Sequence, residues 1–282
     1  MEYVSIKNLS FSYKTTNLFN DLDLQLNPGN IYGLLGINGV GKTTLLKLLL
    51  GLLFPQKGQI MAFNYIPSQR NPGYLSKVFL LPEEVSLPSI SDSEYIKSYA
   101  TFYPSFSSTL LQHCLSEFDM PRKTRLDKLS LGQKKKFLLS FGIACGASLL
   151  ALDEPTNGMD IPSKSIFRKI IAETMHEKRT IIISTHQVKD MESLIDPIII
   201  LHNSHIIFSA TLAQVSQQFH MRRSSSPLKD KEENLIHGET TVGAYWSVWK
   251  GGETEGKSIN LEVLFNAIIA NPNAFKELSD EK

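Results

Sequence analysis

The chain has 282 residues, of which 42% are apolar and 20% are charged, and its formal net charge is +1. This composition is ordinary for a globular protein of one or two domains. A net charge so close to zero gives no overall electrostatic attraction to nucleic acid or to an anionic membrane. The two cysteines lack the spacing of a metal site and the N-terminus lacks the layout of a signal peptide, so a reducing, cytoplasmic location is expected.

The first 35 residues predict β-strands. Residues 3–13 and 19–26 alternate apolar and polar side chains, a turn-forming Asn-Pro-Gly follows at 27–29, and an apolar run occupies 31–35. The sequence GINGVGKTT then separates the last of these strands from a helix predicted over 45–53.

This glycine-rich segment predicts a phosphate-binding loop. Glycine lets backbone N–H groups approach an anion, and the start of the next helix adds unpaired N–H groups and a partial positive charge. The spacing predicts that Lys42 reaches the outer phosphates and that the Thr43 hydroxyl binds Mg²⁺. The residues expected around the phosphates are Gly36, Ile37, Asn38, Gly39, Val40, Gly41, Lys42, Thr43 and Thr44.

The middle of the chain predicts a helical subdomain over about 84–145, after short strands at 57–63 and 77–82. Ser91-x-x-Glu94 is a capping-box pattern, and apolar residues follow it at helical spacing. The longest uncharged run, 137–152, has 16 residues, fewer than the roughly 20 that a membrane-spanning helix needs. It therefore predicts a buried helix followed by a buried strand, and a partner would have to supply any channel.

Residues 148–202 alternate between strands and helices. Apolar strands are predicted at 148–155, 179–185 and 197–202, with helices at 161–177 and 186–195 between them. This alternation favours a mostly parallel sheet covered on both faces, in an α/β fold.

Two acidic residues follow the apolar start of the strand at 148–155. Asp153 is expected to hold the Mg²⁺ that bridges phosphate oxygens. Glu154, as the next strand residue, is expected to face the other way, where its carboxylate accepts a proton from an attacking water.

Beyond residue 204 the pattern changes. It predicts a strand at 205–210, a helix at 211–219, a polar mobile link at 221–235, a strand at 243–252 and a closing helix at 259–269. This extension, residues 205–282, would regulate the protein, help it to dimerise or cap the edge of the sheet.

LSLGQ at 129–133 opens a helix, and with it the chain resembles the nucleotide-binding subunit of ATP-binding cassette (ABC) transporters. GINGVGKTT, LSLGQ, LALDEPTNGMD and STH occur in the order of that family, over most of residues 1–204. The resemblance implies a P-loop ATPase domain with an antiparallel β subdomain and a helical subdomain. It also implies ATP and Mg²⁺ as cofactors, with hydrolysis driving a separate transmembrane permease.

The resemblance further implies two subunits that sandwich two ATP molecules, as a homodimer or with a second ATPase chain. Ser130, Gly132 and Gln133 would contact the nucleotide of the opposite subunit, and Asp160 would lie at the dimer interface. His186 would sense the γ-phosphate. Tyr13 would stack on adenine, with Phe11 as its rival.

Two positions depart from the family pattern. Leu131 stands where a glycine is usual, which reduces backbone freedom. Glu83 stands where a glutamine usually binds Mg²⁺ and contacts the permease; it would act as an oxygen ligand of the metal or only face the partner. Both variations resemble those of export-type members. The lysines at 134–136 are expected to form a solvated face.

Three functions fit these motifs. The first is a transport ATPase, held at the cytoplasmic face of the plasma membrane by its permease, and the resemblance implies that it works in export. The second is a soluble ATPase of the same superfamily acting on nucleic acid or ribosomes, but the single cassette and the lack of a basic surface pattern favour no nucleic-acid partner. The third, a small-molecule kinase, leaves LSLGQ and STH without a role.

Overall fold

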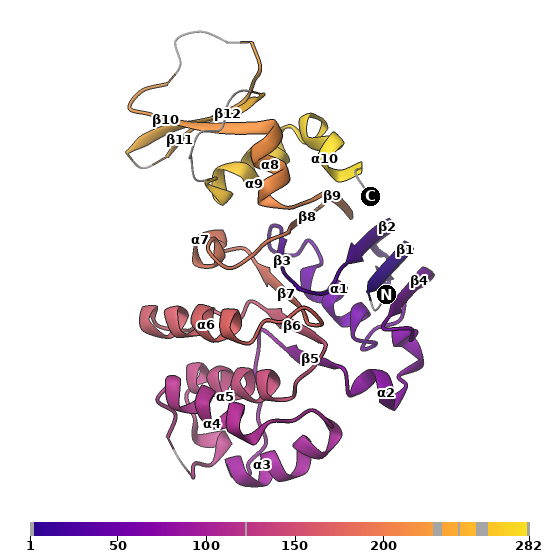
Figure 1. Cartoon of the computed structure of the whole chain (residues 1–282). Coiled ribbons are helices and arrows are strands. Elements are labelled where there is room, and N and C mark those ends of the chain that lie inside the picture. The colour runs from indigo at the N-terminus through magenta and orange to yellow at the C-terminus, as the bar shows by residue number, and fades with distance from the viewer. Residues whose placement is uncertain (1–2, 122, 228–232, 242, 252–258, 281–282) are drawn as a thin grey trace.

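The computed structural model describes residues 3–121, 123–227, 233–241, 243–251 and 259–280, and three β-sheets organise them (Figure 1). The core sheet has the strand order β5-β6-β7-β3-β8-β9. Its strands are β3 (Asn30–Leu35), β5 (Val78–Leu81), β6 (Leu149–Asp153), β7 (Thr180–Thr185), β8 (Ile198–His202) and β9 (His205–Ala210). The first five are parallel, and β9 pairs antiparallel with β8.

The core strands bury both of their faces, which explains their nearly continuous apolar sequences. On β6, Leu150 and Leu152 belong to one apolar cluster, while Leu149 and Ala151 belong to another on the opposite face. The predicted α/β fold with a mostly parallel sheet is confirmed.

The N-terminal antiparallel sheet covers one face of the core together with the first helix. Its order is β2-β1-β4. These elements are β1 (Val4–Tyr13), β2 (Thr16–Leu26), β4 (Lys57–Ala62), α1 (Lys42–Leu49) and the short α2 (Pro72–Leu75). Four leucines of α1 are buried between the two sheets, which explains why its sequence is apolar on most sides.

Helices cover the other face, and the predicted capping box starts the first of them, with Ser91 and Glu94 bonding reciprocally. On the sheet itself lie α5 (Leu131–Ala144), α6 (Ile161–Glu173) and α7 (Val188–Met191), while α3 (Asp92–Tyr99) and α4 (Ser108–Glu117) pack against α5 at one end of the molecule (Figure 1). Single 3₁₀ turns lie at Pro67–Gln69, Ala100–Phe102, Leu126–Lys128 and Pro272–Phe275. The ten-residue helix expected over 186–195 is wrong in length, because Asp196 already pairs with Ile31 of β3 and the chain must straighten before it.

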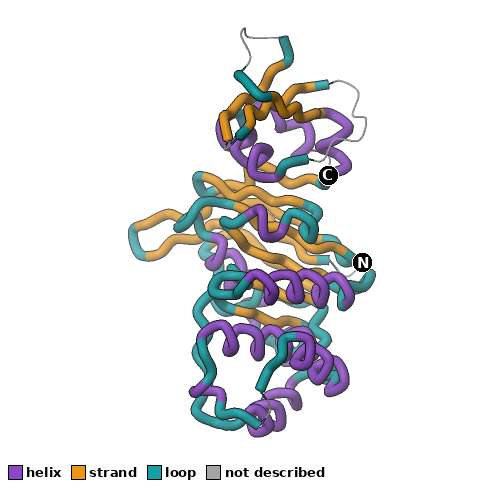
Figure 2. The backbone as a smooth tube through the Cα atoms, turned by 90° about the vertical axis from the view of Figure 1, so that its left-hand side faces the viewer, coloured by secondary structure: helices purple, strands orange, loops and turns teal. Residues whose placement is uncertain are grey.

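The C-terminal part forms a third sheet, of order β10-β12-β11, at the opposite end of the molecule from α3 and α4 (Figures 1 and 2). Its elements are α8 (Leu212–Gln218), β10 (Phe219–Ser224), β11 (Leu235–Thr241), β12 (Ala244–Lys250), α9 (Leu261–Ala270) and α10 (Lys276–Asp280). The polar link expected over 221–235 is wrong at its start, because Phe219 and Met221 are buried and β10 pairs with β12. Residues 228–232 of that link lie outside the described part of the chain.

The expected division between residues 204 and 205 lies in the turn between β8 and β9. The strand after it completes the core sheet, and Phe208 belongs to the same apolar cluster as α5 and α6. That cluster continues into α8, β10, β12 and α9, so the C-terminal part packs on the core rather than standing apart. Within the described residues, no helix combines the length and the apolar character needed to cross a membrane.

Candidate functional site

The glycine-rich loop lies between the carboxyl end of β3 and the first turn of α1. Gly41 precedes the helix with φ 112°, a conformation that favours glycine. A Cβ on Gly36 would stand 2.7 Å from the carbonyl oxygen of Leu201, so only glycine fits there. Residues 37–39 are exposed, and the loop presents its backbone beside a helix N-terminus, where anions bind.

Lys42 is buried at the base of this loop, with 7% of its surface exposed. Its ammonium donates to the carbonyl oxygens of Gly36 at 2.7 Å and Ile37 at 3.3 Å, and lies 3.8 Å from Glu154 Oε1. Burial lowers the pKa of Lys42, and the nearby carboxylates of Glu154, Asp153 and Glu83 oppose that shift. Lys42 therefore lies near three carboxylates at the loop.

Thr43 and Asp153 meet across 110 positions of sequence. The Thr43 hydroxyl donates to Asp153 Oδ2 at 2.6 Å, and the Ser184 hydroxyl donates to Asp153 Oδ1 at 2.5 Å. Ser184 is a site residue that the motif analysis did not single out, although STH contains it. Its position was available from the sheet, because Ser184 on β7 is the register partner of Asp153 on β6.

Glu154 lies directly after β6 and not within it, so the expectation that it continues the strand is wrong. Its φ is 44°, in the left-handed region that non-glycine residues seldom adopt. Its N–H donates to the carbonyl and hydroxyl oxygens of Ser184. Its Oε1 accepts from the backbone N–H of His186 at 3.0 Å and lies 2.7 Å from His186 Nδ1. The turn thus brings its carboxylate to Lys42 and His186.

Glu83 reaches the site through Asn157. Asn157 Nδ2 donates to Glu83 Oε1 at 3.2 Å, and Gln187 Nε2 donates to Asn157 Oδ1 at 3.3 Å. Glu83 is exposed and lies near enough to Lys42 and Lys135 to oppose the lowering of their pKa values by burial. Asn157 connects three segments of the site, a role that its place in the sequence motif did not predict.

The LSLGQ segment forms the first turn of α5. The Ser130 hydroxyl accepts from the N–H of Gln133, and Gln133 Oε1 accepts from the N–H of Ser130, as a capping box. Leu131 is the first helical residue, a conformation that leucine adopts without strain. Leucine in place of the usual glycine therefore introduces no backbone strain there. A Cβ on Gly132 would stand 3.0 Å from the Gly158 carbonyl, so α5 starts against the loop at 154–160.

Asp160 and Tyr13 lie on the surface. Asp160 caps α6 by accepting from the N–H of Ser163, and its carboxylate stands 3.8 Å from the Lys136 ammonium. Tyr13 is 46% exposed and packs edge-on against Phe11, its rival, which is 7% exposed. Of the two aromatic rings, Tyr13 has the free surface.

The solvated face expected for the lysines at 134–136 is wrong for Lys135. This residue is 2% exposed, and its ammonium donates to the carbonyl oxygens of Glu154 and Asn157, each at 3.0 Å. The reason is the close packing of α5 along the loop at 154–160, which covers one side of the helix.

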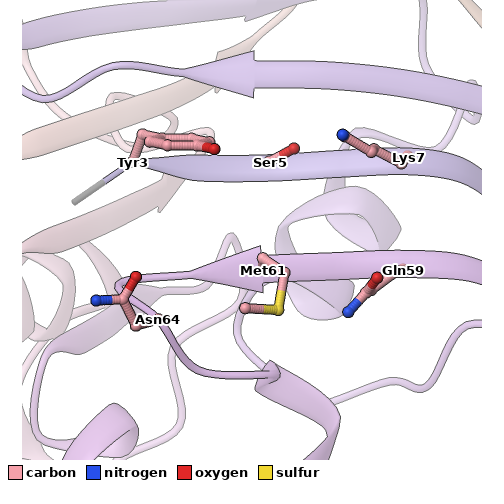
Figure 3. Close-up of a pocket in the computed structure, with 6 residues that line it drawn as sticks. All are labelled: Tyr3, Ser5, Lys7, Gln59, Met61 and Asn64. Carbon is pink, nitrogen blue, oxygen red and sulfur yellow. The ribbon is translucent and has the colours of Figure 1, made fainter. Parts of the chain in front are cut away.

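A shallow hollow of about 190 Å³ lies elsewhere, on the outer face of β1 and β4 (Figure 3). Its lining residues are Tyr3, Ser5, Lys7, Gln59, Met61 and Asn64. It contains none of the motif residues.

The donor set at the loop fits a hard divalent cation. The Thr43 hydroxyl and the Asp153 carboxylate already lie within hydrogen-bond distance, and oxygen donors of this kind suit Mg²⁺, which keeps several waters. Among the described residues, no three His, Cys, Asp or Glu side chains group as a metal site. These residues therefore suit an ion whose other ligands are phosphate and water oxygens, and not an ion held by protein side chains alone.

Comparison with known proteins agrees with this geometry. The family model described as ABC transporter matches residues 19–157. The bacitracin transport ATP-binding protein BcrA of Enterococcus faecalis is 30% identical over 223 residues, which is 77% of this chain and 72% of that protein. The SkfA peptide export ATP-binding protein SkfE of Bacillus subtilis is 30% identical over 229 residues, 79% of this chain and 95% of that protein.

The chain belongs to the ABC transporter family. Among solved structures, an ATP-binding subunit of an ABC transporter superimposes with a TM-score of 0.68 at 26% identity, covering 76% of this chain and 91% of the other. As an ATP-binding subunit of this ABC family, the chain is an ATPase whose hydrolysis powers transport. A small-molecule kinase is set aside by this membership.

Proposed function

We propose that the chain hydrolyses ATP at the loop between β3 and α1 and thereby powers a separate membrane permease, in the direction of export. The observation that supports this most is the convergence of Lys42, Asp153, Glu154 and His186, from distant parts of the sequence, on one loop. The export direction rests on the names of relatives such as the peptide export protein SkfE. We place the chain at the cytoplasmic face of the membrane, through that permease.

We assign the binding steps to the loop and α1. The backbone N–H groups of residues 36–44 surround the phosphates, and Lys42 exchanges its two carbonyl partners for phosphate oxygens. Tyr13 stacks its exposed ring on adenine, a contact suited to a flat, polarisable base. Thr43, Asp153 and Glu83 are the residues that would hold Mg²⁺, which neutralises charge on the phosphates during transfer.

We assign proton transfer to Glu154. Its carboxylate accepts a proton from water as the water oxygen bonds to the γ-phosphorus and the bond to the β–γ bridging oxygen breaks, releasing ADP. His186 holds Glu154 Oε1 through its ring nitrogen and its backbone N–H, and so keeps the carboxylate in place. Ser184 holds the backbone of the same residue by accepting from the Glu154 N–H.

We also propose that two copies, or this chain and a second ATPase, enclose two ATP molecules. Ser130, Gly132 and Gln133 at the start of α5 then face the nucleotide of the opposite subunit, with Asp160 beside them. Three large apolar side chains support this arrangement, because they are exposed in the single chain and a second subunit would cover them. They are Ile37, Leu131 and Ile161, which are 56%, 60% and 84% exposed. The ATPase domain would extend through β9 to Ala210, with the C-terminal extension after it.

Replacing Glu154 with Gln tests this function. The amide keeps the shape of the side chain but cannot take a proton, so we expect ATP binding within about threefold of the parent and a fall in kcat of about a hundredfold or more. Phosphate release and binding of a fluorescent ATP analogue measure the two quantities.

Lys42→Ala is the matched comparison, because it removes a phosphate contact and should weaken binding and turnover together. Parent-like hydrolysis by Glu154→Gln would contradict the role of Glu154 as the general base.

A further inference from the structure

Lys135 is the buried charged residue of the site to which the proposed reaction gives no task. Its side chain leaves the second turn of α5, is 2% exposed, and ends between two backbone carbonyl oxygens. Burying an ammonium is unfavourable unless hydrogen bonds and nearby anions compensate for the lost hydration. The Lys135 ammonium is therefore stabilised by the groups that neighbour it.

Those neighbours belong to the turn that follows β6. The Glu154 carbonyl oxygen accepts from the Lys135 ammonium at 3.0 Å and from the N–H of Asn157 at 3.2 Å. The Asn157 carbonyl oxygen accepts from the same ammonium at 3.0 Å. One cation therefore closes both ends of a four-residue turn.

The backbone of that turn is strained at Glu154, the proposed general base. Glu154 has φ 44°, and a non-glycine residue in this region persists only where surrounding contacts hold it. Ser184 holds its N–H side, and Lys135 holds its carbonyl side. Burial lowers the pKa of Lys135, while Glu83, Glu154 and Asp153 oppose the shift and favour the charged form.

We propose that Lys135 is a positioning residue for hydrolysis, which fixes the left-handed turn at Glu154 and so keeps its carboxylate at Lys42 and His186. The proposal rests on the assignment of Glu154 as the general base. Because Lys135 lies five residues after Ser130 on α5, it also ties the helix that faces one nucleotide to the turn that serves the other.

The test uses the full chain with two replacements of Lys135. Lys135→Met keeps most of the length and volume without charge or donors, and Lys135→Gln keeps amide donors without charge. Each should lower kcat by at least about tenfold while KM for ATP and affinity for a non-hydrolysable ATP analogue change by less than about threefold. Lys134→Met, on the partly exposed neighbour, is the control and should keep the parent rate.

A double-mutant cycle separates positioning from general support of the fold. In a Glu154→Gln background, Lys135→Met should lower the residual rate by less than about twofold, because the group that it positions has already lost its base. An equal fall in both backgrounds would overturn the proposal, and so would a parent-like kcat in either folded Lys135 variant. Parent-like hydrolysis by Glu154→Gln alone would instead remove the proposed function itself.

Discussion

Ser184 joins the two acidic residues of the site through one hydroxyl group. It donates to Asp153 Oδ1 and accepts from the N–H of Glu154, and it is fully buried. If the hydroxyl were removed, Asp153 Oδ1 would lose this donor with no solvent to replace it, whereas the Glu154 N–H would keep the Ser184 carbonyl oxygen as its acceptor.

Ser184→Ala should accordingly lower the free energy of unfolding by about 1–3 kcal/mol, as expected when a buried carboxylate oxygen loses its donor. Urea unfolding measures this change. Ser140→Ala is the control, because that buried hydroxyl donates to the Lys136 carbonyl within its own helix, and its removal should cost about 1 kcal/mol or less. Equal losses in the two variants would show that Ser184 has no special part in the site.

Glu83 provides a second test at this scale. Its carboxylate is exposed and bonded to Asn157, so its attraction to a divalent ion beside Thr43 and Asp153 is partly screened. Glu83→Gln should raise the Mg²⁺ concentration for half-maximal hydrolysis by roughly fivefold, the equivalent of about 1 kcal/mol at such a site. Titration of ATPase rate against Mg²⁺ measures this.

The neighbouring Glu84→Gln, also exposed, is the control and should leave the titration unchanged. Superimposable curves for Glu83→Gln and the parent would leave Glu83 as a contact for the permease alone.

At the scale of elements, α7 joins the site to the C-terminal extension. It starts two residues after His186, and Glu192 at its end accepts from the N–H of Leu261, the first residue of α9. Asn260 accepts from the next two N–H groups, so the start of α9 is held partly by the segment that follows the site histidine. Lys189 and Glu262 add an exposed ion pair at 2.7 Å.

Glu192→Ala should loosen α9 by about 0.5–1 kcal/mol, because a helix N–H loses a charged acceptor near the positive end of the helix. Hydrogen exchange followed by mass spectrometry should then show faster exchange in the first turn of α9. Lys189→Ala, which removes only the exposed ion pair, should change this exchange little. Unchanged exchange in Glu192→Ala would mean that Asn260 alone secures the start of α9.

Much of the arrangement of elements could be predicted from the sequence, because apolar runs and capping patterns are local signals. The strands β6, β7 and β8 followed from uninterrupted Leu and Ile, and the capping box at Ser91 marked the start of α3. The strand β10 was missed because only two of its side chains, Phe219 and Met221, are buried, and its pairing with β12 is a long-range property. The length of α7 was limited in the same way by the pairing of Asp196 with Ile31 on β3, which is distant in sequence.

The residues of the candidate site were likewise predictable only where the signal was local. The motif residues Lys42, Thr43 and Asp153 were found because their chemistry and spacing are encoded together. Lys135 was placed on the surface, since a run of three lysines gives no sign that one of them is buried by a loop more than a dozen residues away. The left-handed turn at Glu154 likewise depends on contacts with β7 and α5 that no local pattern contains.

At the scale of the whole molecule, the proposed dimer predicts that each site is shared. A Lys42→Ala subunit and a Ser130→Arg subunit should each be inactive alone, while an equal mixture contains mixed dimers with one complete site. Recovery of about a quarter of the parent rate follows from random pairing of independent sites. The phosphate-release assay on mixtures of varied ratio measures it.

Analytical ultracentrifugation of Glu154→Gln provides the physical control. This variant should sediment as a dimer with ATP and as a monomer without it, because hydrolysis no longer separates the subunits. A monomer at saturating ATP would contradict the shared site.

The apolar cluster that runs from α5 through the core sheet into β12 and α9 has a consequence for how the molecule unfolds. Phe208 of β9 and Phe219 of β10 both pack on Phe275, beyond α9, so the last strand of the core sheet and the extension share buried surface. Neither side can separate without exposing aromatic rings of the other to water. We therefore expect the extension and this edge of the sheet to unfold as one cooperative unit, with slow amide exchange in both.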